Sequence, residues 1–389
     1  MGSDRVPQDA VRPRIARVQS RRELDDFLEL PHRLHAAEPL WTPPLKHDAR
    51  RSLSPENPLF QAGRAERELF VAYQGKTAVG RVLAHVHHLS NQVHREKAGF
   101  FGFLEFSPGQ PEVGRALMEA VASHHRARGL DEVRGPYELT IHQCLGAVVA
   151  GFEEPAAFAQ SWNGPHVPEL LRALGYQPVM SFSTFRVDDM AACDLDAMLG
   201  PKQRAWLDDP LQRARLVLRP WNMNRFDQEM RAAVDLLNAA FAHNFGFVPL
   251  SDDELKFMAG PLERVVRPDL TVFLELDGAP AGVALVLPDF NVLFRRTGGR
   301  LFPFGWARFW LEAPSVDLAV GQFIATHPQH QNQGLMRLVI RELARRLQAA
   351  GIRAFEGTWI SESNAASRSQ MRALGGRIKH ELQLFSLRI

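Results

Sequence analysis

One short polar segment in the C-terminal half has the position of an anion-binding loop. It follows the apolar run Val316 to Ala325, which predicts a central strand, and it precedes a helical pattern from Gly334 to Ala350. The first turn of a helix has four backbone N–H groups without intrahelical partners, at the positive end of the helix dipole. A glycine there lets the backbone approach a ligand closely. Because a hydrogen bond to a charged acceptor contributes about 1.5–3 kcal/mol, three or four such N–H groups can hold a pyrophosphate without a lysine.

The elements that must position this loop occur twice in the chain. Glu68 to Ala84 and Leu270 to Val286 each read as strand, glycine-containing turn and strand, about 200 residues apart. In each half a helix ending at a glycine, a short strand, a second helix and a final strand follow. This shared order indicates a tandem duplication of one α/β unit. We therefore predict an α/β fold of the α+β mixed-sheet kind, with two tandem domains and a mixed central sheet flanked by helices.

The predicted domain boundaries follow from this repeat and from changes in composition. The stretch between the halves is polar and contains Pro201 and Pro210, so it reads as a linker with at most one connecting helix. In the first half, the counterpart of the polar loop contains Pro108, Pro111 and Glu112, which remove N–H donors and repel phosphate. That half is expected to be a degenerate, structural copy. The predicted ranges are a flexible tail or edge strand over 1–19, the degenerate domain over 20–188, the linker over 189–215, and a ligand-binding domain over 216–389 with an aromatic insertion at 290–312.

Composition excludes several classes of protein. The chain has 389 residues, and its 25 Phe and 7 Trp exclude extended disorder. The net charge of +2 comes without clustered Lys and Arg, so no nucleic-acid partner is expected. Cys144 and Cys193 form no C-x-x-C motif, and no signal peptide or membrane-spanning run is visible, which predicts a cytoplasmic protein with reduced thiols. His85 and His87 share one face of a strand, but no Cys or acidic residue has metal-ligand spacing, so no metal is expected.

Spaced residues in the second half form a pattern that extends beyond the loop. Gln331-x-x-Gly334 is followed by Asn364-x-x-Ser367 and by a glycine pair at Gly375 and Gly376. Over roughly residues 216–389 this resembles the GNAT (Gcn5-related) N-acyltransferase superfamily, with its Q/R-x-x-G-x-G/A loop and later N-x-x-A/S. The resemblance implies that the loop binds the pyrophosphate of a coenzyme A thioester and that the preceding strand splays from its neighbour to pair with pantetheine. The implied binding residues are Phe323, Ile324, Ala325, Gln331, Asn332, Gln333, Gly334, Leu335, Met336, Asn364 and Ser367.

Two departures from the family pattern concern the loop and the proton donor. The third small residue of the loop is Met336 rather than Gly or Ala. The second half contains no tyrosine, the residue type that the family often uses as a general acid toward the leaving thiolate. That role is then vacant, filled by water, or taken by Ser361, Ser363 or Asn364. Of these, Ser363 is retained as a candidate catalytic residue.

Distinctive strings occur along nearly the whole chain. They include Trp41-Thr42-Pro43-Pro44-Leu45, Asn57-Pro58-Leu59-Phe60, Asn244-Phe245-Gly246-Phe247-Val248-Pro249 and Pro288-Asp289-Phe290-Asn291. These strings resemble one bacterial family of tandem GNAT-like proteins that includes acyl-CoA acyltransferases and ceramide synthases, which acylate a sphingoid-base amine. The chain departs from that family at Asn163-Gly164-Pro165-His166, where aromatic residues are expected.

An aromatic and basic insertion separates two strands of the second half. Over 292–311 it contains several Phe and Arg residues together with Trp306 and Trp310. One interpretation is a lipid contact, with the aromatic rings at the headgroup level and the arginines near phosphate. The other is a helical hairpin packed on the first domain, since aromatic residues more often face a core.

Transfer of an acyl group to an amine requires the neutral amine. At a pKa of about 10.4, roughly one amine in 2,500 is neutral at pH 7, so a nearby base helps. His243 is the first choice, because it follows the helix 228–242, where the acceptor-side loop of this fold lies. Asp289 is the second choice, although it equally suits an Asx turn. The candidates considered are His243, Glu254, Glu275, Asp289, His327 and Glu356.

The sequence therefore predicts an acyl-CoA-dependent N-acyltransferase whose acceptor is a small-molecule or lipid amine, such as a sphingoid base. One alternative is a non-catalytic module that senses acyl-CoA or binds a partner. Another is an aminoacyl-tRNA-dependent transferase, against which the weak basic balance argues. The expected location is cytoplasmic, with or without peripheral contact of 292–311 with the inner membrane. Acyl length, acceptor identity and oligomeric state stay open at this point.

Overall fold

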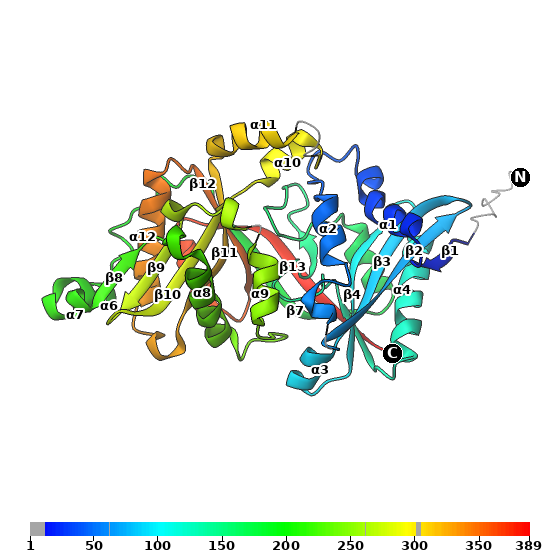
Figure 1. Ribbon diagram of the computed structural model, residues 1–389, viewed down its shortest axis with the longest axis horizontal. Helices are drawn as coiled ribbons and strands as arrows, with labels where there is room; N and C mark the ends of the chain where they lie inside the picture. The colour runs from blue at the N-terminus through cyan, green and yellow to red at the C-terminus, as the bar shows by residue number, and fades with distance from the viewer. Residues whose placement is uncertain (1–11, 62, 261, 301–304) are drawn as a thin grey trace, which may run out of the picture.

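The computed structural model describes residues 12–61, 63–260, 262–300 and 305–389. Their strands join into a single sheet in the order β1-β2-β3-β4-β5-β13-β7-β12-β11-β10-β9-β8, and β6 pairs with β13 beside this path. Figure 1 shows the sheet running along the molecule with helices on both of its faces. The predicted mixed α/β architecture is confirmed.

The first half runs from an edge strand to the middle of the sheet. Its helices and strands are β1 (Arg14–Arg17), α1 (Arg21–Leu34), α2 (Lys46–Ser52), β2 (Ala65–Gln74), β3 (Thr77–His87), α3 (His88–His94), β4 (Ala98–Phe106), α4 (Pro111–Arg126), β5 (Glu132–Gly135), β6 (Ala147–Ala150), α5 (His166–Ala173) and β7 (Gln177–Val187). Of the two alternatives for residues 1–19, Arg14–Arg17 adopt the edge strand, which pairs with β2. Residues 1–11 of that predicted tail lie outside the described residues.

The second half repeats the main elements of this order after the linker, which forms two short helices, α6 (Pro201–Asp208) and α7 (Pro210–Arg215), where at most one was expected. Its helices and strands are β8 (Leu216–Arg219), α8 (Phe226–Phe241), α9 (Asp252–Ala259), β9 (Val272–Leu276), β10 (Ala279–Pro288), α10 (Asn291–Thr297), α11 (Gly305–Glu312), β11 (Leu318–Thr326), α12 (Leu335–Ala349), β12 (Ala354–Ser361), α13 (Ala365–Ala373) and β13 (Arg377–Arg388). The hairpins, the long helices and the final strands thus lie where the sequence repeat predicts them.

The two halves exchange their final strands. β7, from the first half, pairs antiparallel with β12 of the second half. β13, from the second half, pairs with β5 and β6 of the first half, and β7 and β13 pair with each other. The ranges 20–188 and 216–389 stay a prediction as domains, but the hydrogen-bonded ladder crosses between them. Neither half completes its sheet with its own last strand.

A splay opens between β11 and β12. The two parallel strands pair from Leu318↔Ala354 to Gly321↔Gly357, and the pairing then stops although both strands continue. On the other side of β11, the register against β10 shifts between Leu285 and Val286, which leaves Gln322 as an extra residue. Such a β-bulge bends the strand and increases its twist, which explains why β11 turns away from β12 at this point.

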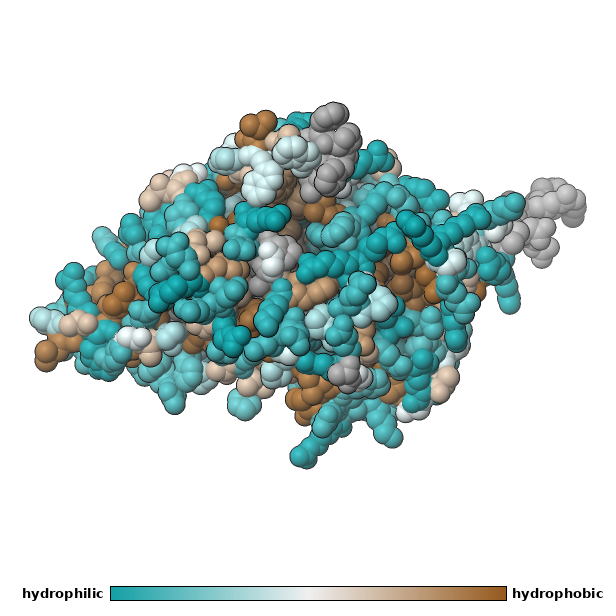
Figure 2. Space-filling model, in the orientation of Figure 1, coloured by the Kyte–Doolittle hydropathy of each residue, from teal (hydrophilic) through white to brown (hydrophobic). Residues whose placement is uncertain are grey.

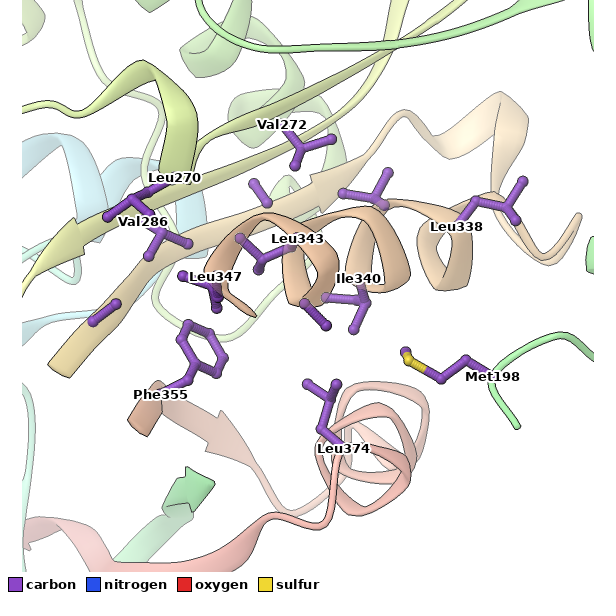
Figure 3. Packing of buried hydrophobic residues seen from close by; sticks show 14 of the residues in the cluster. Met198, Leu270, Val272, Val286, Leu338, Ile340, Leu343, Leu347, Phe355 and Leu374 are labelled. Carbon is purple, nitrogen blue, oxygen red and sulfur yellow. The ribbon is translucent and has the colours of Figure 1, made fainter. Parts of the chain in front are cut away.

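The core packs on both faces of the second half's sheet. On one face, α12 presents leucines at helical spacing to β9, β10 and β12, and Figure 3 shows Leu338, Leu343 and Leu347 on this side. On the other face, α8 covers β10 and the end of β11. Gly334 precedes α12 and Gly351 follows it, and both have positive φ, where the chain turns into and out of the helix. These two layers fix the loop before α12 and the splay beside it.

The aromatic insertion folds as two short helices, α10 and α11. Phe290, Phe294 and Phe309 form an apolar cluster with Leu45 and Phe158 of the first half. The packed-hairpin interpretation therefore holds for the inner face of the insertion. Residues 301–304 of the predicted range 290–312 lie outside the described residues.

Candidate acyl-transfer site

The polar loop before α12 presents a row of free backbone N–H groups. Asn332 and Gly334 both have positive φ, at 63° and 85°. Among the described residues, the N–H groups of residues 332–336 have no hydrogen-bond acceptor, whereas Arg337 N–H already bonds to Gly334 O. Successive N–H groups in such a turn form a concave anion-binding nest at the positive end of the helix. The loop residues Gln331, Asn332, Gln333, Gly334, Leu335 and Met336 therefore come together as one segment, and its predicted role in binding a polyanion stays a prediction.

The side chains of the loop leave this row of donors open. Gln331 Nε2 donates to Thr326 O, and Gln333 Nε2 donates to Gln329 O, so both amides fold back on the loop. His327 Nδ1 accepts from Gln329 N–H and supports the same turn. Met336, the departure from the family pattern, packs partly buried against the core beneath α12 and does not cover the loop.

The splay presents backbone groups of β11 to the opening. His327 N–H donates to Ala281 O, and the register continues as Ala325↔Val283 and Ile324↔Ala284. Antiparallel pairs alternate between hydrogen-bonded and non-bonded, so Ala325 bonds to β10 while the N–H and C=O of Ile324 point toward the splay. The predicted residues Phe323, Ile324 and Ala325 thus line one edge of the opening, with the anion-binding loop at its end.

An apolar cluster surrounds the splay on the α8 face. Phe323 of β11 and Trp359 of β12 pack into it together with Leu237 and Phe241 of α8. The rings of Phe182 and Trp359 contact each other in a tilted arrangement, with centroids 5.4 Å apart. The first half and the exchanged strands contribute the remaining wall, which comprises Phe100, Tyr137, Ile141, Leu145, Val148, Leu382 and Leu384. The surroundings of the opening are therefore apolar and are built by both halves.

Asn364 and Ser367 lie together at the start of α13. Asn364 Oδ1 accepts from Ser367 N–H at 3.0 Å, which caps the helix. Ser363 is exposed, and its hydroxyl lies 2.8 Å from that of Ser361. These residues follow the carboxyl end of β12, on the open side of the splay. Their predicted roles in binding and catalysis stay predictions.

The two candidate bases lie at opposite ends of the strands. His243 is exposed just beyond α8, whose last turns pack near Phe323 on the open side of the splay. Asp289 lies at the other end, where its N–H donates to Leu318 O at the start of β11. At about 3.3 Å per residue, the nine-residue strand separates these two ends by roughly 26 Å. The structure therefore separates Asp289 from His243 and from Ser363, which both lie toward the open side of the splay.

Asp289 is held in an Asx turn. It is 2% exposed, and its Oδ1 accepts from Asn291 N–H and Phe158 N–H, both at 3.0 Å. Burial raises the pKa of Asp289 to about 6, and the nearby Glu356 carboxylate adds to this shift. The Asx turn that the sequence also suited is thus present in the structure. A role in proton transfer would require a substrate to reach the carboxyl of Asp289, which the segment around Phe158 covers.

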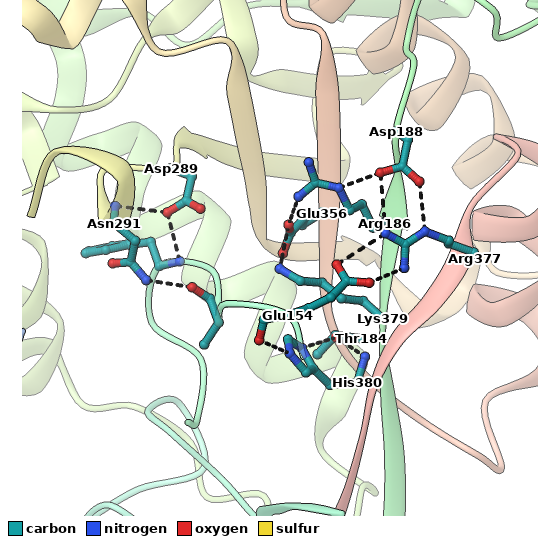
Figure 4. Close-up of polar contacts among 12 residues, drawn as sticks. Glu154, Thr184, Arg186, Asp188, Asp289, Asn291, Glu356, Arg377, Lys379 and His380 are labelled. Atoms are coloured by element: carbon teal, nitrogen blue, oxygen red, sulfur yellow. Dashed lines mark hydrogen bonds and ion pairs between the residues drawn. The ribbon is translucent and has the colours of Figure 1, made fainter. Parts of the chain in front are cut away.

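A buried ion-pair network lies beside Asp289, at the crossing of the two halves. Glu356 on β12 is fully buried, and both of its carboxylate oxygens accept from Lys379 Nζ on β13 at 2.7 Å. Arg186 on β7 also pairs with Glu356, and Figure 4 shows Glu356 between these two cations. Burial lowers the pKa of Lys379, and the Glu356 carboxylate opposes that shift. The carboxylate of Glu356 is therefore occupied by two cationic partners. Lys379 was missed because nothing in the sequence of β13 marks it as buried.

The equivalent splay in the first half is filled by the chain itself. Pairing of β4 with β5 ends at Phe100↔Arg134, and the segment after β5 then runs along the gap. Tyr137 N–H donates to Phe101 O at 2.7 Å, and a Cβ atom on Gly102 would lie 2.6 Å from Tyr137 O. This close backbone contact occupies the place of a ligand, which agrees with a structural role for the first half.

Among the described residues, no group of three or more His, Cys, Asp and Glu side chains has an arrangement that holds a metal ion. In the same part of the chain, no helix is both long enough and apolar enough to cross a membrane.

Comparison with known proteins identifies the class to which this fold and site belong. The model of the Acetyltransferase (GNAT) family matches residues 252–375, which contain the splay, the loop and Asn364. A solved tandem GNAT protein from the clavulanic acid biosynthesis pathway aligns over 97% of this chain and 98% of its own, with a TM-score of 0.56 and 16% identity. At that identity the likeness supports the fold alone, which is a tandem GNAT fold.

Two relatives match along almost the entire chain. A protein of Caulobacter vibrioides (strain NA1000 / CB15N) named Bacterial ceramide synthase is 30% identical over 370 residues, 92% of this chain and 93% of the relative. Protein YghO of Escherichia coli (strain K12) is 26% identical over 381 residues, 95% of this chain and 94% of the relative. The chain belongs to this family of tandem GNAT proteins, and it is an N-acyltransferase of the GNAT type.

Proposed function

We propose that the chain transfers the acyl group of a long-chain acyl-CoA to the amine of a lipid of the sphingoid-base type. The observation that carries the donor part of this proposal is the row of free N–H groups at residues 332–336 beside the splay. The 3.0 Å cap between Asn364 and Ser367 lies on the same open side of β12. A diphosphate on the loop and an extended amide chain along Ile324 would use the groups that are left without partners.

The apolar cluster around Phe323 and Trp359 supports a long acyl chain. Pantetheine that enters the splay from the loop would deliver its thioester toward these rings. Because each buried methylene contributes about 0.8 kcal/mol, two buried methylenes already favour a long chain over acetyl by roughly tenfold.

The proposed chemistry is direct transfer. The amine nitrogen attacks the thioester carbon, the C–N bond forms, the C–S bond breaks, and coenzyme A leaves as a thiol after taking a proton. Of the Phe323–Ala325 edge, the backbone N–H of Ile324 faces the splay, and this group stabilises the negative charge that develops on the carbonyl oxygen. His243 is the proposed acceptor of the amine proton, since it is exposed beside the open end of the splay. Ser363 is the proposed donor to the thiolate.

The outer face of α11 supports a lipid acceptor. Phe309 packs inward, whereas Trp306, Trp310 and Leu311 are 51%, 48% and 81% exposed. Figure 2 shows pale and brown residues gathered over α11 at the top of the view. Arg308 lies on the same short helix, so the face combines Trp, Leu and Arg in the manner of an interfacial segment. We propose that this face contacts the membrane surface from which a lipid amine is drawn.

The donor is tested by calorimetric titration with acetyl-CoA and, separately, with palmitoyl-CoA below its micelle concentration. We expect palmitoyl-CoA to bind at least tenfold more tightly. Preference for acetyl-CoA would point to a small soluble amine, and lack of binding by both would remove the coenzyme A site and favour the interaction-module alternative.

The acceptor is tested by release of free coenzyme A thiol from palmitoyl-CoA with sphinganine and, in parallel, with spermidine as a soluble amine. Thiol release with sphinganine alone is expected, and His243→Gln should lower kcat at unchanged melting temperature. If neither amine leads to release of free thiol, the proposal that the chain acylates these acceptors is contradicted.

The membrane face offers a matched pair of variants. Leu311 and Leu211 are similarly exposed, at 81% and 78%, but Leu211 lies on α7, far along the chain from α11. Flotation with phosphatidylglycerol vesicles should weaken for Leu311→Ala and not for Leu211→Ala. Equal effects of the two substitutions would refute the proposed contact.

A further inference from the structure

The linker helix α6 contacts the anion-binding loop through three side chains. Lys202 Nζ donates to Asn332 O at 2.7 Å. Trp206 Nε1 donates to Gln333 O at 3.1 Å, and Gln203 Nε2 donates to Gly334 O at 2.8 Å. Three consecutive carbonyl groups of the loop are therefore held by donors from one helix that comes from a distant part of the chain.

These contacts decide which way the loop's N–H groups face. In a planar trans peptide, the C=O of one residue and the N–H of the next point in opposite directions. Because the carbonyls of residues 332–334 face α6, the N–H groups of Gln333, Gly334 and Leu335 face away from it. These three N–H groups belong to the free row at residues 332–336. Without α6, the two positive-φ residues of this loop would lose the contacts that select one arrangement of the three peptide planes.

The close packing between α6 and the loop is typical of a specific contact. Gln203 is 4% exposed, and its Oε1 accepts from Gly200 N–H at 3.1 Å, so its amide is fixed at both ends. A Cβ atom on Gly334 would lie 2.5 Å from Gln203 Nε2 and 2.8 Å from Lys202 Cβ. The glycine at this position thus permits the approach of α6, in addition to any approach of a phosphate from the other side.

We propose that α6 is a positioning element of the coenzyme A site, in which Lys202, Gln203 and Trp206 orient the loop so that its N–H groups face the diphosphate. This inference rests on the proposed coenzyme A-dependent function. It assigns a binding role to the predicted linker 189–215, and it makes the connection between the two halves part of the site. None of the three side chains is required to touch the ligand.

The test measures binding of free coenzyme A to the full-length chain by calorimetry. Lys202→Met removes one exposed donor, and Trp206→Phe removes the indole N–H while keeping an aromatic ring. Each lost orienting bond should raise Kd by about twofold to tenfold, the range for one hydrogen bond, and the double variant more than either alone. Arg204→Met is the matched control, because it removes the same charge from an exposed position on the same helix without a contact to the loop.

Kinetics supply a second readout. KM for the acyl-CoA should rise in Lys202→Met and Trp206→Phe, while kcat at saturating donor changes little, and Lys202→Arg should restore binding. Equal weakening by Lys202→Met and Arg204→Met would show a general charge effect and overturn the positioning role. If the wild type binds coenzyme A and Lys202→Met binds it equally well, the inference fails while the proposed function stands. If the wild type does not bind, both fall.

Discussion

Gly334 and Gly351 lie at opposite ends of α12 and provide a controlled test of the loop. Both have positive φ, at 85° and 72°. A Cβ atom on Gly351 would meet nothing within 4 Å, whereas one on Gly334 would meet Gln203 and Lys202 of α6. Alanine at the two positions therefore imposes the same backbone strain, and only Gly334→Ala also displaces the linker helix.

The magnitudes follow from these two contributions. Placing a non-glycine residue in the left-handed region costs about 1–2 kcal/mol. Gly351→Ala should lower the free energy of unfolding by that amount alone. At Gly334 the added Cβ atom would also break the 2.8 Å hydrogen bond from Gln203 to Gly334 O. That loss adds about 0.5–1.5 kcal/mol, so Gly334→Ala should cost about 1.5–3.5 kcal/mol in total.

Urea denaturation and coenzyme A calorimetry on both variants check this reasoning. Gly334→Ala should bind coenzyme A several-fold more weakly, and Gly351→Ala should bind as the wild type does. Gly334→Glu, which also places a carboxylate beside the anion-binding row, should abolish binding while the chain still folds. Equal losses of stability at Gly334 and Gly351, with unchanged affinity at both, would refute the link between α6 and the loop.

Three further predictions concern buried ionisable groups. Glu356→Gln leaves the Lys379 ammonium without its buried partner and should destabilise the fold by about 3–5 kcal/mol in urea, whereas Glu356→Leu combined with Lys379→Met should cost less than the single change. The pKa of Asp289 is raised to about 6, so the stability that this carboxyl contributes is present at low pH and is lost as the pH rises through 6. In a denaturation series, Asp289→Asn should therefore be more stable than the wild type above that pH. Loss of activity in this variant at unchanged stability would instead assign Asp289 the role of the base. Burial lowers the pKa of His85 to about 3 and that of His125 to about 4, so stability should fall as pH drops from 6.5 toward 4, and His85→Gln should make this slope shallower.

Local sequence patterns determined most of the individual elements. The leucine spacing of α12, the glycines at its ends and the apolar run of β11 are visible without a structure, because helix and strand periodicity depends on near neighbours in the chain. The same is true of the loop before α12, whose predicted role in anion binding depends on a helix N-terminus and a glycine that are adjacent in sequence. The prolines in the counterpart loop of the first half likewise predicted a structural role for that half.

Long-range pairing decided the parts that the sequence did not indicate. Both final strands read as ordinary strands, and their exchange between halves depends on which sheet edge each one meets. The pairing of Lys379 with Glu356 and the closure of the first half's splay by Tyr137 have the same origin. In each case the local sequence pattern of the strand or loop would suit a different neighbouring strand equally well.

The candidate site divides in the same way. The sequence by itself indicated the family, and it predicted the loop and the residues Phe323 to Ala325 that the structure places at the splay. The tertiary structure separated His243 from Asp289, placed Asp289 in an Asx turn, and brought α6 onto the loop across 130 residues of chain. The physical reason is that a side chain's role depends on the neighbours that folding brings to it, and those neighbours are set by the packing of the entire sheet rather than by residues nearby in sequence.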